Sequence, residues 1–310
     1  MRHFVAALAL LTVAAVGVSG CSGTSRSAEA TSPTTAASRQ SVLPLTGLEN
    51  PQDVAVDTAG NVYVTDLHQV KVDNGFPDAS TRVIKLAAGS DTQNQLPQFV
   101  HASLMTDPAG AVWVQDGGHG KLVKLAVGPD PQTVLPLVSL GMHGVVQAVD
   151  AAGNVYGNNG GGVDSNGGCC LAVHVVSQAV GSDTPTVLPF NGIDGSGGIA
   201  VDTAGDVYVG DYDHNRVLKL AAGSDTPTVL PFTNVHGIID VAVDRAGSVY
   251  AVDADRNRVL KVAAGSDAPT VVPFDGIDKP IRVTVDTAGN VYVIDGGHRR
   301  VLKLAAPASK

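Results

Sequence analysis

The stretch Thr228-Val229-Leu230-Pro231-Phe232 is followed in turn by Val241-Ala242-Val243-Asp244, Ser248-Val249-Tyr250 and Arg258-Val259-Leu260-Lys261. The chain repeats this line six times with variations. The Val-Leu-Pro or Leu-Pro element of each copy begins at Val42, Leu96, Val134, Val187, Val229 and Val271, and the last three starts are 42 residues apart. A fixed period of this size is typical of a modular array rather than of an ordinary globular fold.

Each copy contains short segments with the alternation expected of β-strands. Val54-Ala55-Val56-Asp57 and Asn61-Val62-Tyr63-Val64 alternate with a period of two and favour β-branched or aromatic residues. The turn Asp57-Thr58-Ala59-Gly60 lies between them, and its Asp-x-Ala-Gly pattern recurs from Asp107, Asp150, Asp202, Asp244 and Asp286. An aspartate caps such a turn through its carboxylate, and glycine accepts the left-handed backbone. We therefore interpret all six aspartates as structural rather than catalytic.

Four strands per copy are predicted, because an Arg-Val-Leu-Lys-Leu segment and a Val-Leu-Pro-Phe segment complete each unit. Six four-stranded sheets fit a β-propeller. The middle residue of the first strand is mostly small, as suits innermost strands: Ala55, Met105, Ala148, Ala200, Ala242 and Thr284. A lone strand at 42–45 precedes the first copy and the last copy ends at 300–304, so the first strand is expected to complete the last blade. The predicted fold class is all-β, a closed six-bladed β-propeller over residues 42–306.

These motifs resemble those of the NHL-repeat family of β-propellers. The resemblance rests on Pro189-Phe190-Asn191-Gly192-Ile193, on the line Val-Asp-Thr-Ala-Gly-Asn-Val-Tyr-Val and on residues 211–220, and it covers residues 42–306. Within the family, the units look most like the extracytoplasmic sensor domain of actinobacterial (mycobacterial-type) receptor serine/threonine kinases. The resemblance implies a rigid surface module for recognition. It does not imply kinase activity, because the propeller takes up the chain.

Residues 1–20 have the pattern of a lipoprotein signal peptide. A short polar start precedes an apolar run over residues 4–18, which is shorter than the roughly 20 residues of a spanning helix. The run ends in Val18-Ser19-Gly20-Cys21, which resembles a bacterial lipobox with Val where Leu is commoner. Cys21 is the predicted lipidation site, with plain secretion as the alternative. Residues 21–41 are rich in Ser, Thr and Ala and are predicted to form a flexible tether.

The composition narrows the range of possible binding partners. Without the signal peptide the chain holds 19 basic and 29 acidic residues, a net charge of −10 that argues against nucleic acid. The chain has only two glutamates, Glu29 and Glu49, whereas aspartate and glycine abound. This balance favours strands joined by tight turns and leaves the repeats without a glutamate acid/base arrangement.

Two repeats depart from the pattern. Blade 1 gains about 11 residues within 67–81, and blade 3 gains about eight within 160–171, each between the second and third strands. In propellers these loops share a face with the loops that lead into the first strands, where three histidines fall. Loops on a rigid scaffold are where function concentrates. The predicted binding face contains His68, Phe76, His101, His143, Asp164, Asp194, His236, Lys279 and Arg282.

Several motifs suggest more specific chemistry. Three loop histidines near one channel mouth could bind zinc, but they occupy different repeat positions, so we interpret them as ordinary polar loop residues. The segments 211–215 and 253–257 mimic the start of a calcium loop without its glycine and distant glutamate, and we interpret them as hairpin turns. The segment 118–121 lacks the spacing of a phosphate loop. No metal or other cofactor is predicted.

Cys169 and Cys170 are adjacent. In an oxidising compartment they form either a vicinal disulfide that stiffens the blade 3 insertion or two reduced thiols in a glycine-rich loop. The sequence leaves both possibilities open.

The sequence favours a monomeric, non-enzymatic lipoprotein on the outer (extracytoplasmic) face of the cell membrane, whose propeller binds an envelope protein, a glycan or a small ligand. One alternative is a metal-dependent lyase of the NHL or streptogramin-lyase type. Against it stand the lack of a glutamate acid or base, the six blades where streptogramin lyases have seven, and the scattered histidines. The other alternative is a structural assembly scaffold.

Overall fold

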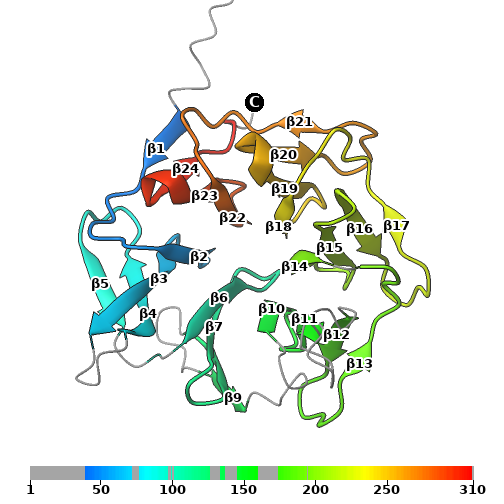
Figure 1. Ribbon diagram of the computed structural model, residues 1–310, viewed down its shortest axis with the longest axis horizontal. Coiled ribbons are helices and arrows are strands. Elements are labelled where there is room, and N and C mark those ends of the chain that lie inside the picture. Colours follow the sequence, from blue (N-terminus) through cyan, green and yellow to red (C-terminus); the bar gives the residue numbers. More distant parts are fainter. Residues whose placement is uncertain are drawn as a thin grey trace, which may run out of the picture. The chain divides into compact units, whose positions relative to one another are not determined.

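Six four-stranded antiparallel sheets are arranged around a common axis (Figure 1). The computed structural model describes residues 39–71, 77–96, 99, 101–125, 133–136, 145–159, 174–193 and 195–308. All of them belong to one unit that spans Thr34–Lys310. Among the described residues, no helix has both the length and the apolar character needed to cross a membrane.

The blades follow one another along the chain. Blade 1 consists of β2 (Pro51–Val56), β3 (Val62–Lys71), β4 (Pro77–Leu86) and β5 (Gln93–Leu96). Blade 2 consists of β6 (Ala102–Thr106), β7 (Val112–Asp116), β8 (Lys121–Lys124) and β9 (Thr133–Pro136). Blade 3 consists of β10 (Val145–Val149), β11 (Val155–Asn159), β12 (His174–Gln178) and β13 (Thr186–Val187). Blades 4 and 5 are β14 (Ser196–Val201), β15 (Val207–Asp211), β16 (Arg216–Leu220) and β17 (Thr228–Val229); and β18 (Ile238–Val243), β19 (Val249–Asp253), the 3₁₀ turn η3 (Ala254–Arg256), β20 (Arg258–Val262) and β21 (Thr270–Val271). Blade 6 is β22 (Pro280–Val285), β23 (Val291–Asp295), the 3₁₀ turn η4 (Gly296–His298), β24 (Arg300–Leu304) and β1 (Gln40–Val42).

The predicted closure is confirmed. β1 pairs with β24 in the register Gln40↔Leu304 to Val42↔Leu302, and in Figure 1 the blue first strand lies beside the red last one. The backbone bonds extend beyond the ladder, from Leu43 N to Val301 O and from Ala305 N to Arg39 O, both 2.9 Å. The ring therefore begins with Arg39 and Gln40, slightly before the boundary that composition suggested.

The interfaces between blades are built mainly from Val, Leu and Ile. The inner strand of each blade contacts that of the next, and β22 contacts β2 to complete the circle. One core cluster combines Val54 and Val64 of blade 1 with Ile294 and Val301 of blade 6. A fully buried side chain of this kind contributes about 1.5–3 kcal/mol relative to an exposed one. The closing interface is therefore as apolar as the others.

The fourth strand is shorter than the predicted Val-Leu-Pro-Phe segment. In blades 3 to 5 it consists of a Thr-Val pair, and the following Leu or Val makes one more bond, as from Leu188 N to Val175 O. Phe190 N then donates to Leu188 O at 2.8 Å, a γ-turn centred on Pro189. Proline fixes the φ angle that this turn needs and lacks an N–H for a ladder, so the strand ends there. Short outer strands also limit the exposed edge of each sheet.

The blade 1 insertion is a hairpin rather than the predicted loop. β3 and β4 pair residue by residue from Val62↔Leu86 to Lys71↔Pro77. Each strand has ten residues, about twice the length of the equivalent strands in the other blades. This ribbon is the largest departure from the repeat among the described residues.

The Asp-x-Ala-Gly turns have the structural role that the sequence predicts. Asp57 Oδ1 accepts the N–H groups of Ala59 and Asn61 at 2.9 Å, and Oδ2 accepts the Tyr63 hydroxyl at 3.0 Å. The equivalent aromatic bonds are Asp107–Trp113, Asp150–Tyr156, Asp202–Tyr208, Asp244–Tyr250 and Asp286–Tyr292. Third-strand lysines lie 4.8–5.4 Å from the centres of five of these rings. Each aspartate therefore ties its turn to the second strand.

Candidate functional site

The two ends of the propeller are built differently. At one end, the loops that lead into the inner strands lie against the turns between second and third strands. Backbone bonds join them, for example Leu67 N to Asn50 O at 2.9 Å and Gly296 N to Lys279 O at 3.1 Å. We call this end the loop-rich face. The Asp-x-Ala-Gly turns form the opposite end, the turn face.

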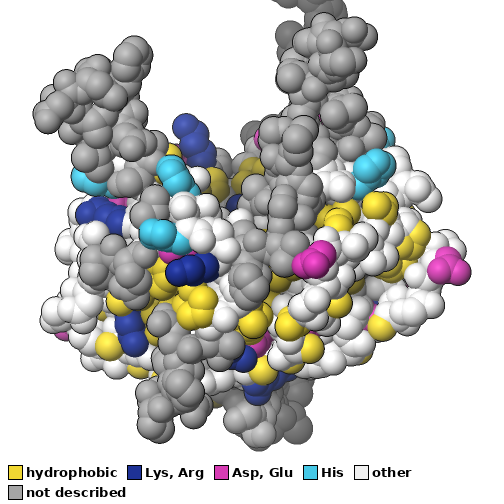
Figure 2. All heavy atoms as spheres, turned by 90° about the horizontal axis from the view of Figure 1, so that it is seen from below, with side chains coloured by type: hydrophobic (Ala, Val, Ile, Leu, Met, Phe, Trp, Pro, Cys, Tyr) yellow, Lys and Arg dark blue, Asp and Glu magenta, His cyan; other side chains and the backbone are white. Residues whose placement is uncertain are grey.

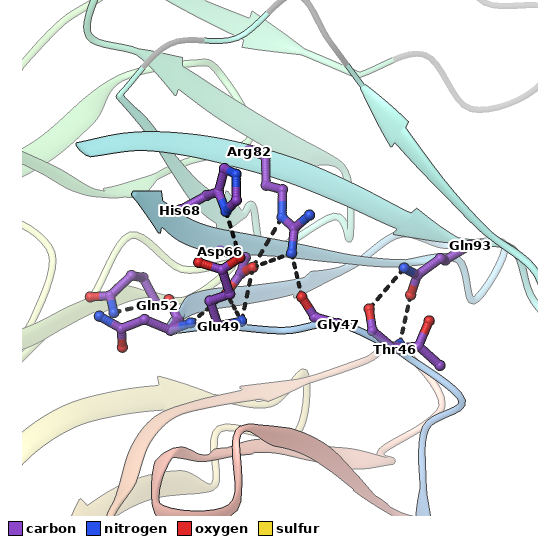
Figure 3. Close-up of polar contacts among 9 residues, drawn as sticks. Thr46, Gly47, Glu49, Gln52, Asp66, His68, Arg82 and Gln93 are labelled. Carbon is purple, nitrogen blue, oxygen red and sulfur yellow. Dashed lines mark hydrogen bonds and ion pairs between the residues drawn. The ribbon is translucent and has the colours of Figure 1, made fainter. Parts of the chain in front are cut away.

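Buried aspartates fasten the loops of the loop-rich face. Asp66, where the pairing of β3 with β2 ends, accepts the N–H groups of Glu49 and Asn50 at 2.7–3.1 Å (Figure 3). It also binds Arg82 through Nε at 3.0 Å and Nη2 at 2.7 Å, and Arg82 reaches the carbonyl of Gly47. The same aspartate–arginine pairs recur as Asp211–Arg216, Asp253–Arg258 and Asp295–Arg300. These carboxylates therefore serve to position loops.

The two segments that mimic calcium loops belong to this set. The Asp211 carboxylate binds Arg216 Nε at 2.6 Å and His214 Nδ1 at 3.0 Å, and the Asp253 carboxylate binds Arg258 Nε at 2.7 Å. Within the described part of the chain, no three His, Cys, Asp or Glu side chains are grouped so as to hold a metal ion. The arrangement supports hairpin turns at both places.

All seven histidines that the structure describes lie on the loop-rich face. Three occupy one repeat position in blades 2, 4 and 6, where they pair with strand-end aspartates at 2.8–3.0 Å: His119–Asp116, His214–Asp211 and His298–Asp295. The others are His68, His101, His174 and His236. In the side view of Figure 2, histidine side chains gather along one edge of the ring. The face thus offers many exposed groups that both donate and accept hydrogen bonds.

The structure separates the predicted site residues. His68 Nδ1 lies 2.7 Å from Glu49 Oε1 within blade 1 (Figure 3). His101 is exposed with φ +50°, and His236 is exposed with its N–H bound to Asp253. His101 and His236 belong to blades 2 and 5, on opposite sides of the ring. Lys279 is exposed at the start of blade 6.

Other predicted residues lie outside the described part of the chain. They are Cys21, Phe76, His143, Asp164, Cys169, Cys170 and Asp194.

Arg282 lies between two aspartates of neighbouring blades at the mouth of the central channel. Its Nε donates to Asp53 Oδ1 of blade 1 at 2.8 Å, and its Nη1 lies 3.8 Å from Asp240 Oδ1 of blade 5. The two aspartates also accept backbone N–H groups of the next blades, Leu104 at 3.4 Å and Val283 at 2.8 Å. This channel triad therefore links blades 5, 6, 1 and 2 across the closing interface.

Burial dominates the electrostatics of the triad. Asp240 is 7% exposed, and this burial raises the pKa of its carboxyl to about 6 although Arg282 opposes the rise. Burial alone would lower the pKa of Arg282, but the carboxylates of Asp240 and Asp53 raise it above its usual value. The triad is a buried charge network whose balance changes between neutral and mildly acidic pH.

Sequence analysis singled out Arg282 but missed its two partners. All three residues stand four positions before a turn aspartate, where the six blades carry Asp53, Ser103, Val146, Gly198, Asp240 and Arg282. A bulge precedes this position in the blades of all three triad members, and bulges re-aim side chains. The signal in the sequence that could have revealed Asp53 and Asp240 was a charged residue at a repeat position that otherwise holds small or apolar residues.

The fold and the repeat can now be compared with known proteins. The family model of the NHL repeat matches residues 197–220, which contain strands β15 and β16. The chain carries an NHL repeat within a six-bladed β-propeller. The chain is 46% identical over 66 residues to the serine/threonine-protein kinase PknD of Mycobacterium tuberculosis in two strains. That match covers 20% of this chain and 8% of the kinase.

Solved structures with similar folds are distant in sequence. A streptogramin B lyase has a TM-score of 0.57 at 12% identity, covering 85% of this chain and 96% of the lyase. Regucalcin from Agrobacterium tumefaciens has a TM-score of 0.55 at 13% identity, covering 85% and 92%. Virginiamycin B lyase from Staphylococcus aureus has a TM-score of 0.52 at 10% identity, covering 86% and 99%. At such identities the likeness concerns the fold alone.

Proposed function

We propose that this chain is a non-enzymatic recognition module that binds an envelope protein, a glycan or a small ligand through its loop-rich face. The observation that carries the proposal is the difference between the two ends. The loop-rich face holds all the described histidines, the extended β3–β4 hairpin and exposed Lys121, Arg256, Lys279 and Arg299. Rigid scaffolds typically present binding residues on such loops.

The state of the carboxylates supports recognition over catalysis. A carboxyl group that acts as a general acid or base must be able to exchange protons with a bound substrate. Asp66, Asp211, Asp253 and Asp295 are each 0% exposed and bind arginines of their own blades. A lyase of the streptogramin-lyase type is the alternative, and the fold likeness carries no assignment of activity.

We further propose that Cys21 is lipidated and holds the protein, as a monomer, on the outer face of the cell membrane. The strand register supports an orientation in which the predicted tether joins the ring at the turn face. Gln40 pairs with Leu304, and Ala306 N donates to Asn290 of a turn-face turn, so β1 starts at the turn face. A tether that enters there leaves the loop-rich face on the far side of the ring, free to meet a partner.

Cys21→Ser is expected to release the protein from the membrane fraction, since the acyl chains that stabilise binding by about 0.8 kcal/mol per buried methylene are lost. The measurement is fractionation of cells expressing each form, with globomycin treatment of the wild type as a second route. Cys169→Ser is the matched control and should stay with the membrane. A Cys21→Ser protein that remains membrane-bound would refute the anchor.

The face assignment is tested by grafting a short turn into blade 1. Residues 67–81 are replaced by the four residues that join the equivalent strands of blade 4, Tyr212–Asn215, which keeps the strand ends at Asp66 and Arg82. Capture from envelope extract is then compared between wild type and graft. We expect the graft to lose a partner that the wild type retains.

The control changes the other end of the ring. Asp183→Ser, Asp225→Ser and Asp267→Ser together remove exposed charges of the loops between third and fourth strands at the turn face. This variant should capture the same partner as the wild type. If the control loses a partner that the graft keeps, recognition takes place at the turn face and the proposal is contradicted.

A further inference from the structure

The ribbon formed by β3 and β4 continues past the sheet of blade 1. β3 pairs with β2 only as far as Asp66, and β4 pairs with β5 only from Val83 onward. The two strands nevertheless go on pairing with each other out to Lys71 and Pro77. Within the described residues, no further strand joins either outer edge of this ribbon.

The backbone of β3 shows which of its groups point to the outer edge. Leu67 N donates to Asn50 O at 2.9 Å, on the side of β2. Because successive residues of a strand direct their N–H and C=O groups to alternate sides, Gln69 and Lys71 direct theirs to the same side as Leu67. Their spacing is about 6.8 Å, twice the rise per residue of an antiparallel strand. This edge is therefore a regular row of donors and acceptors, and the loop at Asn50 already occupies its first place.

The two edges of the ribbon are not equivalent. On β4 the outward residues are Thr81, Ala79 and Pro77, each opposite an outward residue of β3. Proline has no N–H to donate and is one of the residues that protect an edge strand from further pairing. The β4 edge also points away from the ring axis, because β2 is the inner strand of the blade. The β3 edge is thus the more complete of the two and lies on the side of the axis.

The extra length of these strands is not needed to build a blade. In blades 4, 5 and 6 the second strand ends at the aspartate that is equivalent to Asp66. A two-stranded ribbon outside a sheet is only marginally stable by itself, and a third strand would stabilise it. A long strand edge is also a template for association, which natural proteins normally avoid. The extension is therefore better suited to binding than to support of the ring.

We propose that the β3 edge of the ribbon binds an extended segment of an envelope protein as an added β-strand. An extended polypeptide carries donors and acceptors with the alternation and spacing of this edge, whereas the hydroxyls of a glycan do not. The added strand continues the line of β2 beyond Asn50, on the loop-rich face. Main-chain bonds supply affinity in this mode, and alternate side chains supply specificity. The inference rests on the proposed function, because it names a protein as the partner of that face.

The test selects peptides from a phage-displayed random dodecapeptide library on the purified wild type, with the blade 1 graft as counter-selection. The selected peptides are then methylated at one backbone nitrogen at a time. We expect methylation of alternate residues to weaken binding at least about tenfold, since each such change removes a main-chain bond and places a methyl group against β3. Methylation of the residues between them should have little effect. This period of two is the signature of an added strand.

Proline variants of the ribbon test the same contact from the other side. Gln69→Pro and Lys71→Pro remove the two outward donors, which take no part in the ladder to β4, and each should weaken binding at least about tenfold. Gln69→Thr keeps the N–H and should change binding by less than about threefold. Ala79→Pro makes the same change directly opposite Gln69 on the other edge and should leave binding unchanged. Thermal unfolding confirms that each variant is folded.

Several outcomes would overturn the proposal. They are the failure to select any peptide, binding that survives both proline variants of β3, a methylation scan without alternation, and an equal loss with Ala79→Pro. Dimerisation of the purified wild type that Gln69→Pro abolishes would assign the edge to a second copy instead.

The envelope partner separates this inference from the proposed function. A graft that still captures the partner contradicts the proposed function. If the graft loses the partner while Gln69→Pro and Lys71→Pro retain it, the loop-rich face binds its partner by other contacts and only strand addition is refuted.

Discussion

Deletion of residues 39–45 is expected to lower the melting temperature of the propeller by about 10 °C or more. The deletion removes β1 and with it the ladder to β24, the bond from Leu43 N to Val301 O and the reciprocal side-chain bonds between Gln40 and Asp275. It also uncovers β24, where Val301 and Leu302 are 0% exposed. Losses of about 4 kcal/mol shift melting by this amount in a domain of such size.

The measurement is thermal and urea unfolding of the deletion beside the wild type. Deletion of residues 24–30 removes the same length from the predicted tether and should leave the transition unchanged. We also expect the 39–45 deletion to self-associate, because an uncovered strand edge is a template for pairing. An unchanged melting transition in the 39–45 deletion would refute closure by β1 as a source of stability.

Arg282→Leu is expected to destabilise the fold by about 3 kcal/mol at pH 7. The guanidinium is the partner of two largely buried carboxylates, and its removal leaves both without a counter-charge. Partial exposure of the Arg282 side chain places the expected loss at the lower end of the usual range. Arg299→Leu, an exposed arginine of the same blade, is the matched control and should change stability by less than about 0.5 kcal/mol.

The pH dependence gives the triad a distinct signature. Because burial raises the folded pKa of Asp240 to about 6, well above the usual value of an aspartate, the native state binds a proton more tightly than the unfolded chain does. The wild type should therefore gain stability from this group as pH falls from 7 through 6 toward 4. Asp240→Asn should remove that gain and, in combination with Arg282→Leu, recover part of the loss at pH 7.

Unfolding measured across pH 4.5–7.5 checks both expectations. If Arg282→Leu costs less than 1 kcal/mol at every pH, or if Asp240→Asn leaves the pH profile unchanged, the triad does not fasten the closing interface.

Most of the fold could be predicted from the repeat, because residues close together in the chain specify the turns and strands of each blade. Asp57 and its five counterparts specify a turn by their own side-chain bonds, and the alternation of β-branched residues specifies the flanking strands. Closure followed from the phase of the strands. The extent of the outer strand did not, because in blades 3 to 5 Pro189, Pro231 and Pro273 end the ladder through a γ-turn that strand propensity does not reveal.

The candidate site was less accessible from sequence, because its groups meet across blades. Asp53, Asp240 and Arg282 are up to 229 residues apart in the chain and come together only when the ring closes. The extended hairpin was also missed, since residues 67–81 read as an insertion whose internal pairing depends on continuing β3 and β4. His101 and His236, which the sequence placed in loops of the same face but at different repeat positions, stand on opposite blades.

Residues that recur from blade to blade and residues that depart from the repeat have different roles. The turn aspartates, which all six blades share, and the buried aspartate–arginine pairs of blades 1, 4, 5 and 6 are engaged in contacts within their own blade. Among the described residues, the largest departures from the repeat are the β3–β4 hairpin and the channel triad, which lie on the loop-rich face and at the mouth of the channel. The central claim is therefore that partners meet the loop-rich face.

Photo-cross-linking on intact cells tests this claim most directly. A benzoylphenylalanine probe is placed at exposed Lys279 on the loop-rich face or at exposed Asp225 on the turn face. The account predicts a specific adduct from position 279, competed by excess purified wild-type protein, and none from position 225. A specific adduct from position 225 with none from position 279 would contradict it.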